Sequence, residues 1–144
     1  MASTISYNST IKLGVATSNV YTVPTVALGE VTSISFDGVA QSTIEITQLS
    51  DAVKKFTAGL LDPGSISLEV NLDQDDATQA LLFTASTDRT LRSYLISFGV
   101  ASSGGMTVSG LGIVTGFSVK AGLDAVLTAS FTIKCTAAYT IAAL

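Results

Sequence analysis

The sequence predicts a mainly β fold, a β-sandwich or partial barrel of about seven strands with one flanking α-helix. Two patterns predict it. Apolar and hydroxyl-bearing side chains alternate with a period of two along several segments, as expected for strands that bury one face. Only one segment carries a clear helix start followed by a helical run. At 144 residues, the chain is expected to form a single domain, 1–144.

The predicted strands are bounded by residues that favour turns. In the clearest strand, residues 65–72, the apolar side chains Ile66, Leu68 and Val70 alternate with polar ones. The Gly-rich segment 106–120 is expected to be a bulged strand. The predicted strands cover residues 11–17, 30–37, 42–48, 65–72, 91–98, 106–120 and 124–136.

The strand predicted over 42–48 should bury one face and expose the other. Its alternation points Ile44 and Ile46 inward and Glu45 and Thr47 outward.

The connection after this strand combines lysines with bulky apolar side chains. Ser50 is a suitable N-cap for a short helix over 51–56, and Gly59 would end that helix. Asp-Pro-Gly at 62–64 then predicts a turn, because Pro presets φ and Gly permits a positive φ. The residues that stand out in this connection are Lys54, Lys55, Phe56, Leu60 and Leu61.

The helix predicted over 72–86 begins with an acidic cluster. Asp73, Asp75 and Asp76 can accept hydrogen bonds from the free amides of the first turn and lie at the positive end of the helix dipole. Its buried face is expected to comprise Ala77, Ala80, Leu81 and Thr84.

The surface of this chain is unusually poor in charge. Charged residues make up 12% of the sequence, about half of the usual ~25%. Because a surface with few charges tends to associate, we expect much of the outside to be covered by partner subunits. The net charge of −4 disfavours tight nucleic-acid binding, which depends on Lys and Arg.

The sequence offers little for catalysis or for holding cofactors. It contains no histidine, the usual general base and the commonest metal ligand. Cys135 is the single cysteine and is expected to be a small buried apolar side chain. Glu45 and Glu69 could face the same side of one sheet, but no Trp marks a sugar cleft. We therefore assign no catalytic, cofactor-binding or metal residues and expect no enzyme.

No targeting or membrane segment is expected. The N-terminus has neither a basic start nor an apolar core, so it does not predict a signal peptide. Residues 93–119 contain no charge, but their Gly and Ser content favours strands and a turn over a membrane helix.

The order of features resembles the major tail tube proteins of long-tailed, siphovirus-type bacteriophages. The resemblance is carried by the run IEITQLSDAVKKFTAGLLDPGSISLEVNLD, then DDATQALLFTAS with Gln79, LRSYLISF, a Gly-rich strand and LTASFTIKCT. It implies a small β-sandwich with a flanking helix, whose inner sheet joins a hexameric ring barrel. Stacked rings would form the tube that conducts DNA into the host without binding it specifically. The chain would be a minimal version of the family, with no appended immunoglobulin-like domain.

The resemblance also implies a location and partners. The protein would be assembled in the host cytoplasm and lie in the tail of the virion. It would contact further copies of itself and other tail proteins, such as the terminator and the tape measure. Residues 1–10 would be an N-terminal arm, and residues 49–64 an inter-ring loop. Contacts between rings are expected at Lys54, Lys55, Phe56, Leu60 and Leu61; alternatively, Phe56 and Leu60 fold back onto their own sandwich.

The side chains that line the channel are a separate expectation. The first predicted set is Glu45, Thr47, Ser67, Glu69 and Asn71. A second set consists of Ser33, Ser35, Thr128, Ser130, Thr132 and Lys134. The alternatives to a phage tube are the tube of a related secretion or contractile injection system and a small-ligand carrier built on a β-barrel.

Overall fold

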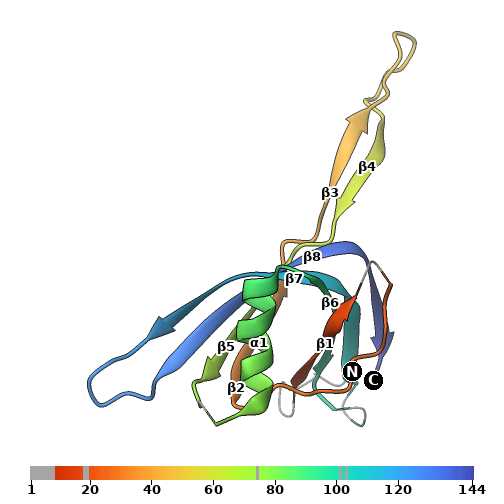
Figure 1. Ribbon diagram of the computed structural model, residues 1–144. Coiled ribbons are helices and arrows are strands. Elements are labelled where there is room, and N and C mark those ends of the chain that lie inside the picture. Colours follow the sequence, from red (N-terminus) through yellow and green to blue (C-terminus); the bar gives the residue numbers. More distant parts are fainter. Residues whose placement is uncertain (1–8, 18–19, 74, 101, 103) are drawn as a thin grey trace.

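The protein folds into one curled antiparallel sheet, a projecting hairpin and one helix (Figure 1). The computed structural model describes residues 9–17, 20–73, 75–100, 102 and 104–144. This arrangement confirms the predicted mainly β fold with a flanking helix. The elements are β1 (Thr10–Thr17), β2 (Val31–Asp37), β3 (Ala40–Glu45), β4 (Phe56–Asp62), β5 (Ser65–Asn71), α1 (Ala77–Asp88), β6 (Leu91–Phe98), β7 (Met106–Lys120) and β8 (Thr128–Ala143).

Two long strands give the main sheet its curl. The sheet has the order β1-β6-β7-β8-β5-β2, with β7 and β8 at its centre. The first half of β7 pairs with β6, up to Gly112, whereas β8 follows β7 along nearly its whole length. The register of β7 against β8 shifts at 109–111 and at 114–116, as expected for a bulged strand. The sheet therefore bends into a partial barrel.

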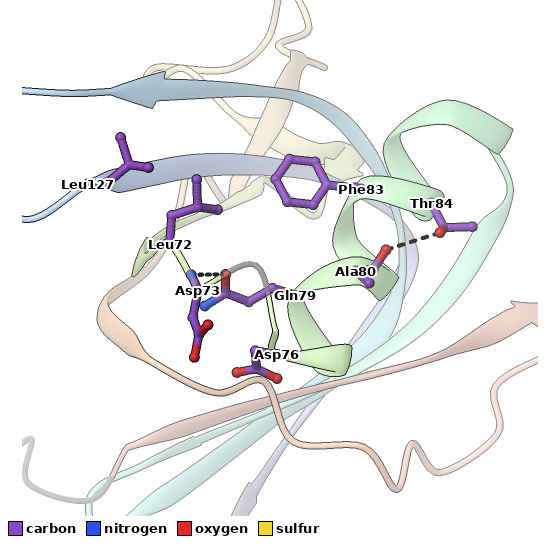
Figure 2. A pocket seen from close by; sticks show the side chains of 8 residues that line it. All are labelled: Leu72, Asp73, Asp76, Gln79, Ala80, Phe83, Thr84 and Leu127. Carbon is purple, nitrogen blue, oxygen red and sulfur yellow. Dashed lines mark hydrogen bonds between the residues drawn. The ribbon is translucent and has the colours of Figure 1, made fainter.

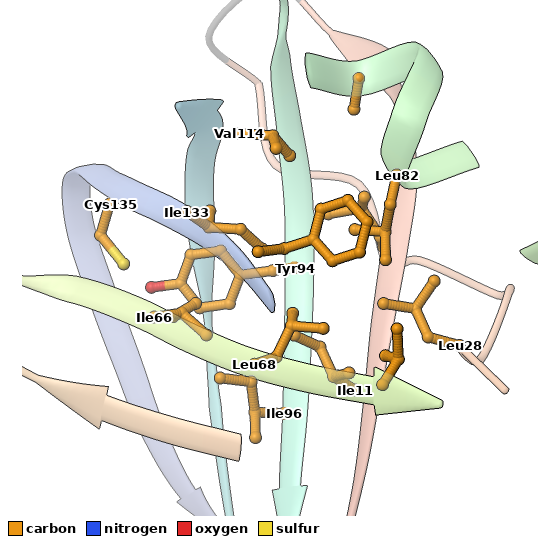
Figure 3. Close-up of a cluster of buried hydrophobic side chains, with 14 of the residues drawn as sticks. Ile11, Leu28, Ile66, Leu68, Leu82, Tyr94, Ile96, Val114, Ile133 and Cys135 are labelled. Atoms are coloured by element: carbon orange, nitrogen blue, oxygen red, sulfur yellow. The ribbon is translucent and has the colours of Figure 1, made fainter. Parts of the chain in front are cut away.

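The core lies inside the curl and is closed by the helix (Figure 3). Tyr94 of β6, Phe131 of β8 and Leu82 of α1 are buried there with the inward side chains of β5. Phe83 extends this packing, since its ring makes edge-on contact with Phe131 at 5.3 Å between centroids. Burial of such side chains is the main driving force for the fold.

The buried face of α1 differs from the predicted one. The helix buries Gln79, Leu82 and Ala85, whereas Ala77, Ala80 and Thr84 are exposed. The reason is the amide of Gln79, which donates to the carbonyl of Asn71 at 2.8 Å and accepts from the backbone N–H of Asp73 at 2.9 Å. These bonds allow a polar side chain to occupy a core position.

The start of the helix agrees with the expectation that carboxylates cap it. Asp76 is the N-cap, and its Oδ1 accepts from the backbone N–H of Thr78 at 2.9 Å. The bonds from Thr78 hold the pKa of Asp76 below its usual value.

The segment between the predicted strands 42–48 and 65–72 was predicted incorrectly. No helix forms over 51–56, and Gly59 lies within a strand instead of ending a helix. Strands β3 and β4 pair with each other as a separate two-stranded sheet. Ile44 and Ile46 are therefore exposed, because a hairpin with no third layer has no interior to bury them.

The turn at the base of this hairpin was predicted correctly. Gly64 has φ of +85°, and its N–H donates to the side chain of Asp62 at 2.9 Å. The last strand differs in its limits, since it runs from Thr128 to Ala143 instead of from 124 to 136.

Candidate assembly surfaces

One face of the section β2-β5-β8-β7 is lined by hydroxyl groups. In the register of this section, Ser67 lies opposite Ser35 on one side and Thr132 on the other. One step along, Glu69 lies opposite Ser33 and Ser130. Directly opposed residues of antiparallel strands point to the same side of a sheet, and the other side of β5 is buried in the core. These side chains therefore share one outward face, which we call the hydroxyl face.

The charges on the hydroxyl face are few and of mixed sign. Lys134 is paired with Asp62 at 2.9 Å, and Lys120 lies in the row of Thr128 and Asn71 at the far end. Among the described residues, this face therefore has no cluster of cations that would hold a polyanion.

The structure brings the two predicted sets of channel residues into a new arrangement. Ser67, Glu69 and Asn71 of the first set share the hydroxyl face with the whole second set, because β5 pairs with both β2 and β8. Glu45 and Thr47 do not join them, since they belong to the projecting hairpin. Glu45 and Glu69 thus lie in different sheets, contrary to the expectation of one sheet.

The β3–β4 hairpin stands clear of the body (Figure 1). Several of its apolar side chains are exposed. Phe56 and Leu60 are 56% and 90% exposed, so they do not fold back onto the sandwich. Leu61 is also exposed, as are Leu49 and Val53 nearer the tip. Such a run of exposed apolar side chains indicates a contact surface.

The two lysines of the hairpin differ in their surroundings. Lys55 forms an ion pair of 3.0 Å with Asp51 inside the tip. The backbone N–H of Gln48 and Lys55 together hold the pKa of Asp51 below its usual value. Lys54 is exposed and forms no ion pair with the residues that the structure describes.

The hydroxyl-face section ends in two open strand edges. On one side, β2 is the last strand of the sheet. On the other side, residues 113–120 of β7 pair with β8 alone, because the pairing of β7 with β6 ends at Gly112. Open edges expose backbone donors and acceptors that can pair with another chain. The sequence pattern could not reveal them, because they depend on strand order.

A groove lies between α1 and the start of β8 (Figure 2). Its volume is about 680 Å³. Leu72 and Leu127 line one side of the groove, and Ala80, Phe83 and Thr84 of α1 line the other. Asp73 and Asp76 lie at its rim. The sequence patterns did not reveal this groove, because Leu127 and the residues of α1 that line it come from segments far apart in the chain.

The described residues offer neither an accessible thiol nor a cluster of potential metal ligands. Cys135 is buried as expected, and burial raises the pKa of its thiol. The described residues contain no group of three or more potential metal ligands. Among the helices described, none has the length and apolar character needed to cross a membrane.

Comparison with known structures places the fold among tube components. The structure is similar to a chain of the SPP1 tail tube, with a TM-score of 0.70, 8% identity, and 99% of this chain and 80% of that chain covered. It is also similar to a chain of the cap that terminates the tube of the anti-feeding prophage, with a TM-score of 0.73, 14% identity, and coverage of 100% and 93%. At such identities the likeness concerns the fold alone.

The fold is thus one that is found in a phage tail tube and in the cap of the anti-feeding prophage tube. A comparison with curated protein sequences found no match. A family model described as lambda-like phage tail tube matches residues 12–111, which is more than half of the chain. The protein therefore belongs to the lambda-like phage tail tube family and is a structural component of the virion tail, as the sequence resemblance predicted.

Proposed function

We propose that copies of this chain close into hexameric rings that stack as the tail tube and conduct DNA during ejection. The observation that carries the proposal is the four-stranded section β7-β8-β5-β2, which has an open edge at each end and one hydroxyl-lined face. Pairing of β2 in one copy with residues 113–120 of β7 in the next would join these sections into a continuous barrel. Closure of the barrel removes both edges.

The hydroxyl face becomes the channel wall in this arrangement. The helix and the core lie on the other side of the sheet, so the free face of the section turns to the inside of the ring. Ser67, Glu69 and Asn71 line the channel together with the hydroxyl groups of β2 and β8. A wall with few cations gives phosphates no strong binding site, so DNA passes with little friction.

The role is structural and not catalytic. The absence of histidine from the sequence supports this, since the commonest general base is missing. The partners are further copies of the chain, with the terminator and the tape measure as the other tail proteins. The arm expected over 1–10 would end before Thr10, which is the first residue of β1, and 1–8 lie outside the described residues. The β3–β4 hairpin, to which most of residues 49–64 belong, provides the contact between rings through Lys54, Lys55, Phe56, Leu60 and Leu61.

Electron microscopy of concentrated purified protein tests the proposal. We expect hollow tubes or rings, and a reconstruction with β2 beside the distal half of β7 of the neighbouring copy. A chain that stays monomeric at every concentration and salt condition would contradict it. DNA or protein found inside tubes isolated from infected cells separates a phage tube from the tube of an injection system.

A further inference from the structure

The hairpin and the start of α1 lie at opposite ends of β5. Gly64 at the root of the hairpin precedes the first residue of β5, and the chain leaves the other end of β5 toward α1. Seven residues of strand span roughly 20 Å. Figure 1 shows the hairpin pointing away from one end of the body, while α1 begins at the other. In a head-to-tail stack, the hairpin of one copy therefore points toward the start of α1 in the next.

The tip of the hairpin is an ordered projection. The carboxylate of Asp51 accepts from the backbone N–H of Gln48 at 2.7 Å and pairs with Lys55 at 3.0 Å. Across the tip, the backbone N–H of Lys55 donates to the hydroxyl of Thr47 at 2.9 Å. These bonds hold the loop in shape, and a preorganised loop loses less entropy when it binds.

The exposed surface of the tip is apolar and carries one cation. Leu49 and Val53 are 109% and 75% exposed. Lys54 lies beside them without an ion-pair partner among the described residues. Side chains this exposed contribute nothing to the stability of the single chain, so their apolar area remains available for a contact.

The groove beside α1 has the complementary properties. Its wall is apolar, and its volume of about 680 Å³ falls within the range of about 300–1,000 Å³ typical of binding pockets. Asp73 and Asp76 stand at its rim, with Asp75 exposed next to them. None of these carboxylates pairs with a cation of the described chain, so the rim is negative.

We propose that the hairpin tip, residues 47–54, inserts Leu49 and Val53 into the groove of a copy in the adjacent ring. Lys54 then lies against the acidic rim. This inference rests on the proposed tube function and names the surface that receives the hairpin. Because the two surfaces differ, the contact is heterologous; it does not close on itself but repeats along an open stack.

Cross-linking tests the contact directly. In a Cys135→Ala background, Leu49→Cys is combined with Thr84→Cys, whose parent side chain lines the groove. Each copy both gives and receives a contact. Oxidation of assembled tubes should therefore yield a ladder of disulfide-linked multimers on a non-reducing gel. The matched control combines Leu49→Cys with Ser118→Cys, which lies opposite Ser130 on the hydroxyl face and should give no ladder.

Charge exchange provides a second, independent measurement. Lys54→Glu and Asp75→Lys should each raise the protein concentration needed for tubes about two- to fivefold, as expected for an exposed ion pair. The double variant should return close to the parent value. Asp75→Lys combined with Lys120→Glu, on the hydroxyl face, should show no such rescue.

The outcomes separate this inference from the tube function. A ladder in tubes together with rescue by charge exchange supports the docking. Tubes that form normally but give neither result overturn it and leave the tube function intact. A ladder that forms equally in isolated rings also overturns it, since the tip would then contact a copy in its own ring. Failure of the parent protein to form rings or tubes contradicts the tube function itself.

Discussion

The Nζ of Lys134 lies 2.9 Å from Oδ1 of Asp62, and this ion pair ties β8 of the main sheet to the last residue of the hairpin. The same oxygen accepts from the backbone N–H of Gly64 at 2.9 Å. Asp62 therefore links the body, the turn and the hairpin. Since the proposed contact between rings depends on where the hairpin points, the direction of its root matters for assembly.

We expect Asp62→Asn to loosen the hairpin root while leaving the core intact. The change removes the ion pair with Lys134, and both side chains are about half exposed, so the midpoint of thermal unfolding should change little. Amide hydrogen exchange should become faster in β3 and β4 but not in β5. Asp124→Asn, in the loop between β7 and β8, is the control. Equal exchange rates in the two variants would show that the pair does not order the hairpin.

The bonds that Asp62 accepts also predict how the hairpin responds to acid. The amide of Gly64, and then Lys134, hold the pKa of Asp62 below its ordinary value of 3.8. A lowered pKa means that the stabilisation is complete above the ordinary value and is lost as the pH falls through the lowered one. The protection factors of the hairpin amides, which are corrected for the intrinsic pH dependence of exchange, should therefore be constant above about pH 4 and fall only below it. Protection factors that already fall at pH 6 would contradict this assignment.

Gln79 should be essential for the stability of the monomer. Gln79→Met keeps a similar volume but leaves the carbonyl of Asn71 and the N–H of Asp73 without their buried partners. Unsatisfied buried groups of this kind predict a loss of about 2–4 kcal/mol in the free energy of unfolding. Urea titration followed by circular dichroism measures it, with Gln48→Met on the exposed tip as control. A loss no larger than that of the control would mean that water replaces the amide.

Two glycines of β7 should differ in how far their replacement by alanine changes stability. A Cβ at Gly112 would lie 2.7 Å from Cγ2 of Ile133 and 3.3 Å from the carbonyl of Lys134. Overpacking of this kind predicts a loss of about 1–3 kcal/mol in stability for Gly112→Ala. A Cβ at Gly116 meets nothing within 4 Å, so Gly116→Ala should change stability by no more than about 0.5 kcal/mol. Similar urea midpoints for the two variants would refute the packing argument.

The parts of the fold that sequence predicts well are those with local signals. The alternation in Ser65–Asn71 identifies β5, because its two faces differ in burial. The helix α1 is recognised from the carboxylates at its start. Its buried face was misassigned because Gln79 is polar, and only its bonds to the backbone groups of Asn71 and Asp73, at the end of β5, make its burial favourable.

The hairpin and the hydroxyl face show why the rest could not be predicted. In β4, Leu60 and Leu61 are adjacent, so the segment lacks the alternation of a half-buried strand. The hydroxyl face unites Ser35, Ser67 and Thr132, which come from three strands far apart in sequence. No local sequence pattern determines the register between such strands. Three members of the first predicted set therefore share one surface with the whole second set, although the two sets looked like alternatives.

The hydroxyl face should be reachable by small molecules but not by large ones once tubes have formed. In a Cys135→Ala background, Ser67→Cys should react in the monomer with both N-ethylmaleimide and maleimide carried on a large dextran, because Ser67 is exposed there. In tubes it should react with N-ethylmaleimide alone, since a polymer wider than the channel cannot enter. Thr87→Cys, on the exposed side of α1, should react with both reagents in both states. Dextran labelling of Ser67→Cys in intact tubes, at the rate seen for Thr87→Cys, would place the hydroxyl face on the outer wall, and the helix would then have to line the channel.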